Sequence, residues 1–493
     1  MKKLIYLFIT LIISNLSYSQ SLDDALRYSK SNLSGTARYV SMGGAFGALG
    51  GDLSSISDNP AATGVFMYSE VNFSPTLYNS LNKTEFSNNK SYDNRYNFNF
   101  NNIAFIVSSK TKNSDWKSLN YAFTYKRLDN YHHNYYAYGE NNNNSITDYF
   151  AEQANGTSLY DLDNNYDGRY IGDNAYQTYL IDPDSVAPIN NEYHSMYNNY
   201  GETQSNTIKT KGRKDQWSFA IGANYKDMLY IGASLGYSTI NFNYSSTFRE
   251  RNLDKNIDNF KEMQYYNEYT TKGYGYRFNI GFIVKPIKWL RIASSFQTPI
   301  RYYLSDSYSH VIDSWGIYAN GEEKYRSSSS PIGNYDYYIT TPLKINAALG
   351  FVIAKKATIG LEYNYIDYSR AKINSRENTD EFAIDNADIS QILNPSHNAK
   401  IGFEYRLGQI SLRTGLSYFD SPYNDTQMNK DSYTIYYNGG IGFNIDYYYI
   451  DFAYSYGQSN YYYYPYQLES TNTAPYYISQ NTNKFIMTMG VRF

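Results

Sequence analysis

Alternation of apolar and polar residues at every second position is the feature that most constrains this sequence. Residues 217–225, WSFAIGANY, place Trp217, Phe219 and Ile221 on one face of an extended chain and small or polar residues on the other. The same pattern resumes at 230–244 after the short connection KDM, so the two runs predict a β-hairpin. A strand with one apolar and one small or polar face suits a wall between lipid and a wet or plugged interior.

The sequence contains about fourteen runs of this kind. They start near residues 65, 96, 116, 209, 229, 264, 288, 336, 357, 397, 410, 431, 447 and 477. Short turns such as 226–228 alternate with long polar connections, notably 139–208 and 306–335. An up-and-down barrel has this parity, because its tight turns gather at the periplasmic end and its long loops at the outer end. We therefore predict an all-β fold, a transmembrane antiparallel up-and-down β-barrel of about 14 strands over residues 65–493.

Composition and the C-terminus agree with residence in a membrane. Aromatic residues make up 18% of the chain, including 61 tyrosines and 25 phenylalanines, and such rings suit the two membrane–water interfaces. After the N-terminal region no apolar run is long enough for a spanning helix. The last strand, KFIMTMGVRF, ends at Phe493 and is typical of the signal that barrel-assembly machinery reads. We expect that machinery and outer-membrane lipid to be partners, and the outer membrane of a Gram-negative bacterium to be the location.

The N-terminal region has two parts. Lys2 and Lys3 precede an apolar run at 4–13 and then Ser17-Tyr18-Ser19, which predicts a secretory signal peptide over 1–19. Residues 20–64 do not alternate and contain SLDDALRYS, which predicts a short helix. We therefore expect a compact segment, a hatch, before the first strand.

Glycines crowd the stretch GGAFGALGGDLSSISDNPAA at 43–62. A phosphate-binding loop is a poor fit, because no strand precedes the glycines and no Lys-Ser/Thr follows them. A segment packed inside a barrel needs close approach of its backbone to the wall, which glycine permits. The predicted hatch residues are Gly43, Gly44, Gly47, Gly50, Gly51, Asn59, Pro60 and Ala61. A flexible periplasmic leader is the alternative, against which the apolar Phe46, Leu49 and Ile56 argue.

These residues bring a resemblance into view. GTARYVSMGGAFGALGGDLSSISDNPAAT at 35–63 and GFIVKPIKWLRIASSFQTP at 281–299 resemble the FadL/TodX family of outer-membrane transport proteins, some of which carry a haem-receptor label. The resemblance implies a plugged, fourteen-stranded barrel that admits hydrophobic molecules. It also implies a sideways opening at a kinked early strand, which the sequence alone does not locate.

We therefore expect passive uptake of hydrophobic small molecules, such as long-chain fatty acids or other lipophilic compounds. The predicted ligand-contacting residues are Phe46, Leu49, Ile56, Val65 and Phe66. No cofactor, metal or catalytic residue is predicted, and scattered basic residues with a net charge of −3 exclude nucleic-acid binding. The alternative is a non-transporting barrel that serves as a docking partner for protein secretion or surface assembly through its tyrosine-rich loops.

Other motifs favour structural roles. GASLG around Ser234 matches a hydrolase motif but lies in an alternating run rather than a strand-to-helix turn. His132 and His133 could bind haem or a metal, or could lie in an aromatic girdle. DNNYDG at 163–168 matches half of a calcium loop, or is a polar surface loop.

Prolines suggest one further possibility. Pro299 and Pro342 fall near the outer ends of consecutive predicted strands and cannot donate to a ladder. They mark either the points where these strands leave the membrane or a weakened seam in the wall.

Overall fold

The computed structural model describes residues 21–493 except 113, 165–169, 186, 188–189, 198–199, 253–259, 318–321, 377–380 and 470. The predicted signal peptide and most of the predicted calcium loop lie outside the described residues.

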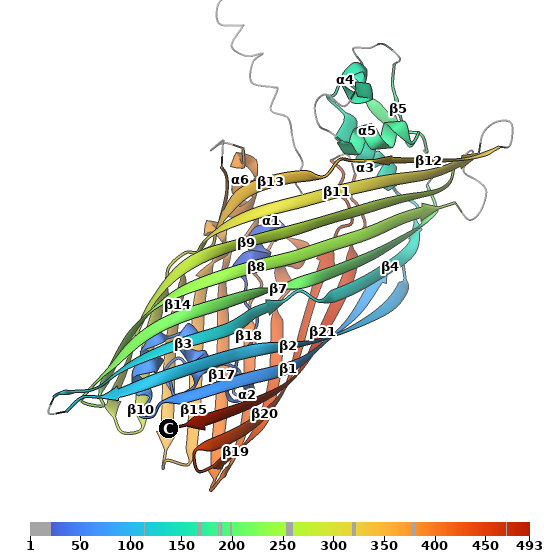
Figure 1. Ribbon diagram of the computed structural model, residues 1–493. Coiled ribbons are helices and arrows are strands. Elements are labelled where there is room, and N and C mark those ends of the chain that lie inside the picture. The colour runs from blue at the N-terminus through green and yellow to red at the C-terminus, as the bar shows by residue number, and fades with distance from the viewer. Residues whose placement is uncertain are drawn as a thin grey trace, which may run out of the picture.

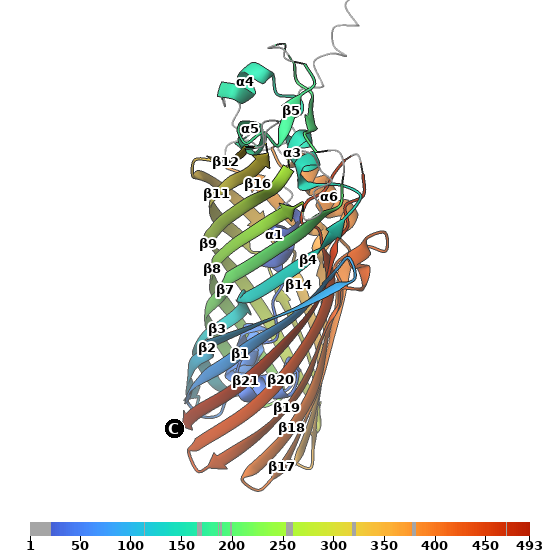
Figure 2. The same cartoon turned by 90° about the vertical axis from the view of Figure 1, so that its right-hand side faces the viewer.

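The described strands form a closed antiparallel β-barrel whose wall the chain crosses 14 times, as the alternation predicts. Each crossing of the wall is called a stave here. Three staves are made of two consecutive strands each. In chain order the strands are β1 (Glu70–Phe86), β2 (Asn89–Lys110), β3 (Trp116–Asn130) continued by β4 (His133–Asn141), β7 (Glu202–Tyr225), β8 (Leu229–Arg251), β9 (Phe260–Ile287), β10 (Leu290–Gln297) continued by β11 (Arg301–Ile317), β13 (Gly333–Thr340) continued by β14 (Lys344–Ile353), β15 (Ala357–Asp367), β17 (Pro395–Leu407), β18 (Ile410–Phe419), β19 (Thr434–Ile445), β20 (Tyr448–Tyr463) and β21 (Tyr476–Arg492). The last strand closes the barrel by pairing with β1 from Glu70↔Arg492 to Glu85↔Tyr477 (Figures 1 and 2).

An apolar belt bounded by aromatic rings surrounds the barrel. At its outer edge the rings of Tyr125 and Trp217 lie 4.6 Å apart, and Tyr237 is opposite Trp217 in the ladder. Near the short turns at the other edge, Trp116 packs against Tyr225 with ring centroids 5.1 Å apart. Between these edges the outward side chains are apolar and exposed, among them Phe219, Ile221, Ile231, Leu235, Ile280 and Phe282. Such a surface is stable in lipid, because the rings suit the interfaces and the aliphatic side chains suit the hydrocarbon.

Several strands continue well past this belt on the side of the long connections (Figure 1). Over 306–335, which we expected to be a loop, β11 pairs first with β13 and then, farther out, with β12 (Glu323–Ser329). The alternation persists in these segments, but their outward residues are polar, so an apolar face does not mark them as strands. Likewise, β7 already begins at Glu202, inside the segment expected as the loop 139–208.

The rest of 139–208 includes a small folded unit, here called the cap. It contains α3 (Ile146–Ala154), α4 (Leu159–Asn164), α5 (Tyr170–Gln177), β5 (Ile181–Pro183) and β6 (Tyr193–Ser195). Phe150 of α3 is fully buried in a cluster that includes Phe248 of β8 and Met263 of β9. The cap is therefore packed on the outer ends of the barrel strands (Figure 2).

Smaller elements cover other outer connections. They are η3 (Tyr368–Arg370), β16 (Lys372–Ser375), α6 (Ala383–Ile392) and η4 (Met428–Asp431).

Residues 21–66 lie inside the barrel in two layers (Figures 1 and 2). The upper layer is α1 (Ser21–Ser29). The lower layer, here called the hatch body, comprises α2 (Ala37–Ser41), η1 (Leu53–Ser57) and η2 (Pro60–Val65). None of the helices in the described part of the chain has the length and apolarity needed to cross a membrane.

Candidate functional site: the hatch and the upper lumen

Side-chain caps hold the turns of the hatch body. The Thr36 hydroxyl accepts a bond from Tyr39 N at 3.0 Å and donates to Asp52 Oδ2 at 2.7 Å. Asn59 caps η2 by accepting from Ala61 N at 3.0 Å, and its amide donates to Gly47 O at 2.8 Å. The Asn-Pro-Ala turn therefore folds back onto the glycine stretch.

Most glycines of the hatch adopt backbone angles that other residues avoid. Gly43 and Gly44 have φ values of 62° and 73°, and Gly50 and Gly51 have 58° and 69°. Gly47 is different, because its constraint is space. A Cβ there would lie 2.9 Å from atoms of three wall side chains, and its N–H donates to Glu362 Oε2 at 2.9 Å.

The barrel wall contributes a first row of glycines opposite the hatch body. Gly222, Gly232 and Gly281 are direct ladder neighbours on β7, β8 and β9. A Cβ on Gly232 would overlap Pro60 O, and one on Gly281 would overlap the Asn59 side chain. The backbone of the Asn59-Pro60 turn therefore packs directly against the backbone of the wall.

A second row lies farther around the wall. Its members, neighbours in register on four strands, are Gly350 of β14, Gly360 of β15, Gly402 of β17 and Gly415 of β18. A Cβ on Gly360 would overlap Ala45 O, and one on Gly402 would overlap Met42 O. The two rows form seats for the two halves of the hatch body.

Wall side chains also bind the hatch body by hydrogen bonds to its carbonyl oxygens. The donors and acceptors are Lys484 Nζ to Leu33 O (2.7 Å), Ser417 Oγ to Gly43 O (2.8 Å), Arg277 Nη2 to Ser57 O (2.7 Å), Ser295 Oγ to Asp58 O (2.7 Å), and Asn120 Nδ2 to both Thr63 O and Phe66 O (2.8 Å each). Charged, amide and hydroxyl donors thereby satisfy carbonyl oxygens that lack helical or strand partners.

Buried ion pairs add to this attachment. Glu404 of β17 is fully buried and accepts from Arg38 of the hatch at 2.8 Å and from Arg413 at 2.7 Å, while Arg413 also binds Asp451 at 2.6 Å. Burial by itself would lower the pKa of Arg38, but Glu404 outweighs it, and the net pKa is raised. Arg38 is therefore a permanent cation that ties α2 to the wall.

A second charged contact lies at Asp58. Its carboxylate is 3.3 Å from Lys126 Nζ and 3.5 Å from Lys344 Nζ, and it accepts a bond from the Tyr39 hydroxyl. Burial would raise the pKa of Asp58, but Lys126, Lys344 and Lys400 together hold it well below its usual range. The carboxylate therefore stays ionised and joins the end of η1 to two wall strands, β3 and β14.

The five predicted ligand-contacting residues do not line one shared pocket. Phe46 and Leu49 belong to a buried cluster with Tyr436 of the wall. Ile56 and Phe66 belong to a second cluster, and Val65 packs against a third. Each side chain fills the space between the hatch body and the wall.

A larger buried apolar cluster packs around α1, above the hatch body. Its buried members are Ala25, Leu26 and Tyr28 of α1 and, from the wall and outer connections, Tyr131, Ile240, Phe242, Tyr269, Ile300, Tyr302, Leu304, Tyr337, Ile339, Tyr368, Ala371, Ile373, Phe382, Ile389 and Leu393. Tyr131 and Phe242 meet edge to face with centroids 5.1 Å apart. We call the part of the lumen that this cluster fills the upper chamber; α1 fills its centre, and none of the cluster's residues was predicted from the sequence to contact a ligand.

The wall beside this chamber is interrupted. The β2–β3 ladder ends at Asn102↔Lys126, and within the described residues the outer part of β2 has no ladder partner on that side. The third stave breaks between β3 and β4, and among the described strands β4 forms no ladder with β2. Side chains bridge the gap, with Arg95 Nη1 donating to Asn134 Oδ1 at 2.6 Å. Tyr131, at the break, also belongs to the upper chamber.

The proline seam is a smaller irregularity. The β10–β14 ladder ends at Gln297↔Lys344, and β11–β13 begins at Arg301↔Thr340. Between them Thr341 N donates to Ile300 O at 2.9 Å, and Ile300 N donates to Thr341 Oγ1 at 2.9 Å. The two strands stay joined past both prolines.

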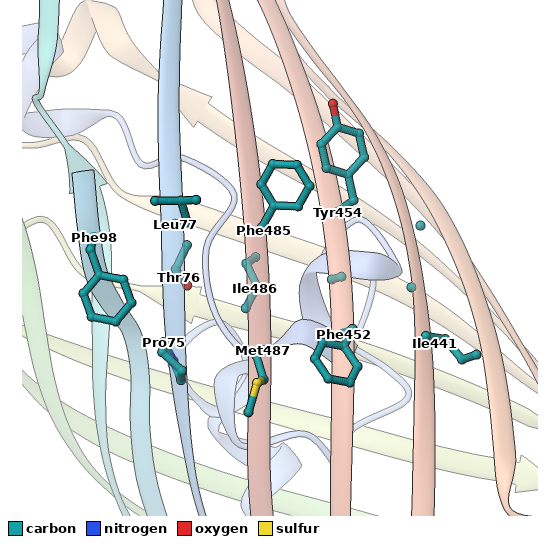
Figure 3. Close-up of a pocket in the computed structure, with 13 residues that line it drawn as sticks. Pro75, Thr76, Leu77, Phe98, Ile441, Phe452, Tyr454, Phe485, Ile486 and Met487 are labelled. Atoms are coloured by element: carbon teal, nitrogen blue, oxygen red, sulfur yellow. The ribbon is translucent and has the colours of Figure 1, made fainter. Parts of the chain in front are cut away.

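Two hollows lie on the outward side of the wall. One of about 540 Å³ is lined by Leu77, Phe98, Phe452 and Phe485, whose side chains project from β1, β2, β20 and β21 in Figure 3. The other, of about 590 Å³, lies over the first glycine row. Their lining includes exposed, lipid-facing side chains, so neither is a chamber for a ligand inside the barrel.

The remaining motifs have structural surroundings. Ser234 lies within β8. His133 is half-buried between Tyr78 and Tyr135, with Ser80 Oγ at 2.8 Å from its Nδ1. Among the described residues no group of three or more His, Cys, Asp or Glu residues is placed to hold a metal ion.

Comparison with known proteins extends the fold assignment. No family model matches the chain, and no curated protein matches it. Among solved structures, a Pseudomonas aeruginosa FadL homologue matches 94% of this chain and 100% of its own at 10% identity and a TM-score of 0.56. The Ralstonia pickettii toluene transporter TbuX matches 93% of this chain and 98% of its own at 12% identity and a TM-score of 0.50. The Pseudomonas putida toluene transporter TodX matches 94% of this chain and 100% of its own at 10% identity and a TM-score of 0.50. The chain therefore has the fold of the FadL-type barrels, a multi-pass antiparallel β-barrel.

Proposed function

We propose that this protein is a passive channel through which hydrophobic small molecules enter across the outer membrane. One observation carries the proposal: a buried aromatic cluster packed around α1 inside the barrel adjoins an interruption in the wall and lies above the hatch body. Two of the solved structures of the same fold are described as toluene transporters, which supports an apolar cargo for this chain.

In this proposal the hatch body is a fixed seal. Its carbonyl oxygens, Arg38 and Asp58 are bound by several strands, and its backbone rests on two glycine rows. Moving it as a unit would leave buried charges without partners, which costs several kcal/mol for each broken pair. Gly43, Gly44, Gly47, Gly50, Gly51, Asn59, Pro60 and Ala61 thus serve the closed floor, and Phe46, Leu49, Ile56, Val65 and Phe66 fill it.

The movable part is α1. Its wall contacts in the chamber are mainly apolar, and its polar attachments gather at two places. Lys214 Nζ donates to Tyr28 O at 2.7 Å and to Lys30 O at 2.6 Å, and the Tyr337 hydroxyl donates to Asp24 Oδ2 at 3.3 Å. An apolar ligand can replace the apolar contacts of α1, so displacement of α1 about the anchor at Lys214 would admit cargo to the chamber.

The exit follows from the position of the chamber. Tyr131 borders both the chamber and the break between β3 and β4, where side chains alone join the third stave to the outer part of β2. A hydrophobic molecule can leave sideways into lipid there without crossing the charged hatch body. This route needs no cofactor and no energy input.

An uptake assay tests the proposal. Phe242→Asn places an amide in the chamber wall, and Phe248→Asn makes the same change six residues along β8 under the cap. Both phenylalanines are 2% exposed, so the two variants are matched for burial. We expect Phe242→Asn to lower the initial uptake rate of labelled toluene or oleate at least about tenfold, since an unpaired buried amide disfavours an apolar occupant. Equal uptake by both variants at equal outer-membrane levels would remove the chamber from the route.

A docking role is the second candidate, and the cap favours it. The cap has its own buried core and exposes Tyr160 and Tyr179 at more than half of their surface. Exposed tyrosines are typical of protein interfaces. Mass spectrometry of material that copurifies with the detergent-extracted protein separates the two functions: a lipophilic molecule supports transport, and a stoichiometric protein partner supports docking.

An enzymatic role has less support. Ser234 lies in the middle of β8 rather than on a strand-to-helix turn, so it lacks the exposure of a hydrolase nucleophile.

A further inference from the structure

A group of basic residues lies directly beyond the aromatic edge of the belt on one face of the barrel. Its members, here called the basic patch, are Lys211 and Arg213 of β7, Lys272 of β9 and Arg301 of β11. All four are exposed and lie on the outward side of their strands. Arg301 is opposite Tyr276 in the ladder, and so belongs to the aromatic edge itself.

The ladder brings these cations together. Arg213 and Lys272 are both opposite Asn241 of β8, one on each side, which sets their strands about 10 Å apart. Lys211 is opposite Asn243 in the next outward row. The patch therefore alternates cations with amide side chains that can donate further hydrogen bonds.

The charge of the patch is only partly neutralised by the protein. Asp215 accepts from both Arg213 and Arg127 at 2.9 Å, so one carboxylate faces two guanidinium groups. Within the described residues no ion-pair partner accompanies Lys211, Lys272 or Arg301. The next outward carboxylate on β9, Glu268, lies two outward rows farther from the membrane and is bonded to the Tyr266 hydroxyl at 2.7 Å.

Other faces of the barrel differ at the same height. Beyond the belt on β20 and β21 the outward residues are neutral, among them Gln458, Asn460, Asn481 and Asn483. The basic patch therefore distinguishes the face of β7, β8, β9 and β11, which lie side by side in Figure 1, from the face of β20 and β21.

We propose that the basic patch binds the phosphorylated headgroup of an anionic lipid in the outer leaflet. Its position fixes this occupant, because the patch begins at the aromatic edge, where headgroups lie, and the outward surface below it is apolar. Two cations about 10 Å apart can flank one headgroup, and the amides of Asn241 and Asn243 lie between them. Each Lys or Arg beside an anionic lipid surface adds roughly 1 kcal/mol, which is about fivefold in affinity.

The test compares lipid binding by two triple variants of the full chain in detergent. Lys211→Gln/Arg213→Gln/Lys272→Gln removes the patch, and Lys285→Gln/Lys288→Gln/Lys356→Gln removes three cations at the opposite end of the barrel. The probes are lipid A with two phosphates, lipid A without phosphate, and inorganic phosphate, measured by native mass spectrometry. We expect the unmodified protein and the control variant to prefer the phosphorylated lipid, and the patch variant to lose roughly a hundredfold in affinity for it.

Three results would overturn the proposal: equal binding of both lipids by the unmodified protein, unchanged binding by the patch variant, or an equal loss in the control variant. Retention of inorganic phosphate as strongly as the lipid would also contradict it, since the site would then bind a free anion. Cooperative heat unfolding of each variant, followed by its shift in gel mobility, verifies that the barrels are folded. This test is independent of transport, because it measures neither uptake nor binding in the lumen.

Discussion

At the scale of single residues, the absence of a side chain is as informative as any side chain present. Gly402 lies in the second glycine row, and a Cβ there would overlap the carbonyl oxygen of Met42. Gly439 is a wall glycine with open space, since the nearest atom to its Cβ would be Arg413 O at 4.0 Å. The two positions allow the seating of the hatch body to be tested without changing charge or polarity.

We predict that Gly402→Ala loosens the hatch body and that Gly439→Ala does not. Because backbone atoms rather than flexible side chains block the new methyl group, the hatch must shift, and we expect a cost of about 1–3 kcal/mol. The chain has no cysteine, so Ala48→Cys gives a single reporter in the hatch body. Its rate of thiol modification should rise at least about fivefold with Gly402→Ala; an equal rate with both alanine variants would refute backbone-to-backbone seating.

At the scale of elements, α1 is held by groups whose charge changes with pH. Burial raises the pKa of Asp24 to about 6 despite the nearby Arg27, and burial lowers the pKa of Lys30 to about 8. Compared with the released helix, the docked helix therefore holds more protons below about pH 6, on Asp24, and fewer protons above about pH 8, on Lys30. Docking strengthens as the pH falls through 6 or rises through 8, and is weakest between these values.

We predict a pH dependence of α1 release that follows this sign. The measurement is the rate at which a thiol reagent modifies Cys in the Ala25→Cys variant, divided at each pH by the rate for an unfolded peptide of the same sequence. This ratio should be highest near pH 7 and at least about tenfold lower near pH 5. Asp23, Asp306 and Tyr337 also face Asp24. Asp23→Asn/Asp24→Asn should remove most of the difference between pH 5 and pH 7. A rate that falls steadily from pH 5 to pH 7 in the parent variant would contradict the assignment.

The interruption between β2 and β4 gives a second prediction at this scale. Arg95→Cys/Asn134→Cys joined by a short bismaleimide closes the gap, because these side chains already meet across it. Thr207→Cys/Thr247→Cys makes the same cross-link within the continuous β7–β8 ladder. We expect the first cross-link, but not the second, to lower uptake of a hydrophobic probe at least about tenfold. The same double variants without the cross-linker are the control.

At the scale of the whole molecule, the belt predicts behaviour in solution. The exposed apolar side chains between the aromatic edges cover the full circumference, and such a surface aggregates in water. We expect the purified protein to require detergent for a monodisperse state and to migrate as a compact species in gels until it is heated. A monodisperse protein in buffer without detergent would contradict a barrel in lipid.

The sequence predicted the architecture because lipid imposes a simple rule on outward residues. Every strand with apolar side chains facing lipid, such as 217–225, was visible as alternation. The polar extensions of β7 and β11 were not, because beyond the membrane the outward faces of these strands are polar. Hydrogen-bond register across strands was also invisible, so Gly222, Gly232 and Gly281 could not be read as one row.

The candidate site was predictable only in part. The glycines and the Asn59-Pro60-Ala61 turn identify the hatch because they are contiguous in sequence. The upper chamber is assembled from residues between Leu22 and Tyr423, each of which belongs to an ordinary alternating run or loop. Only closure of the barrel brings Phe242, Tyr302 and Tyr337 around α1, and no local pattern records that closure.

The two glycine rows also have a consequence for biogenesis. Their close fit against Met42, Ala45 and Pro60 leaves no clearance for a leader to be threaded into a finished cylinder. We therefore expect the hatch body to be in place before β1 and β21 pair, so that their pairing encloses it. The segment that blocks the pore in the mature protein would then also act as a template on which the sheet closes during assembly.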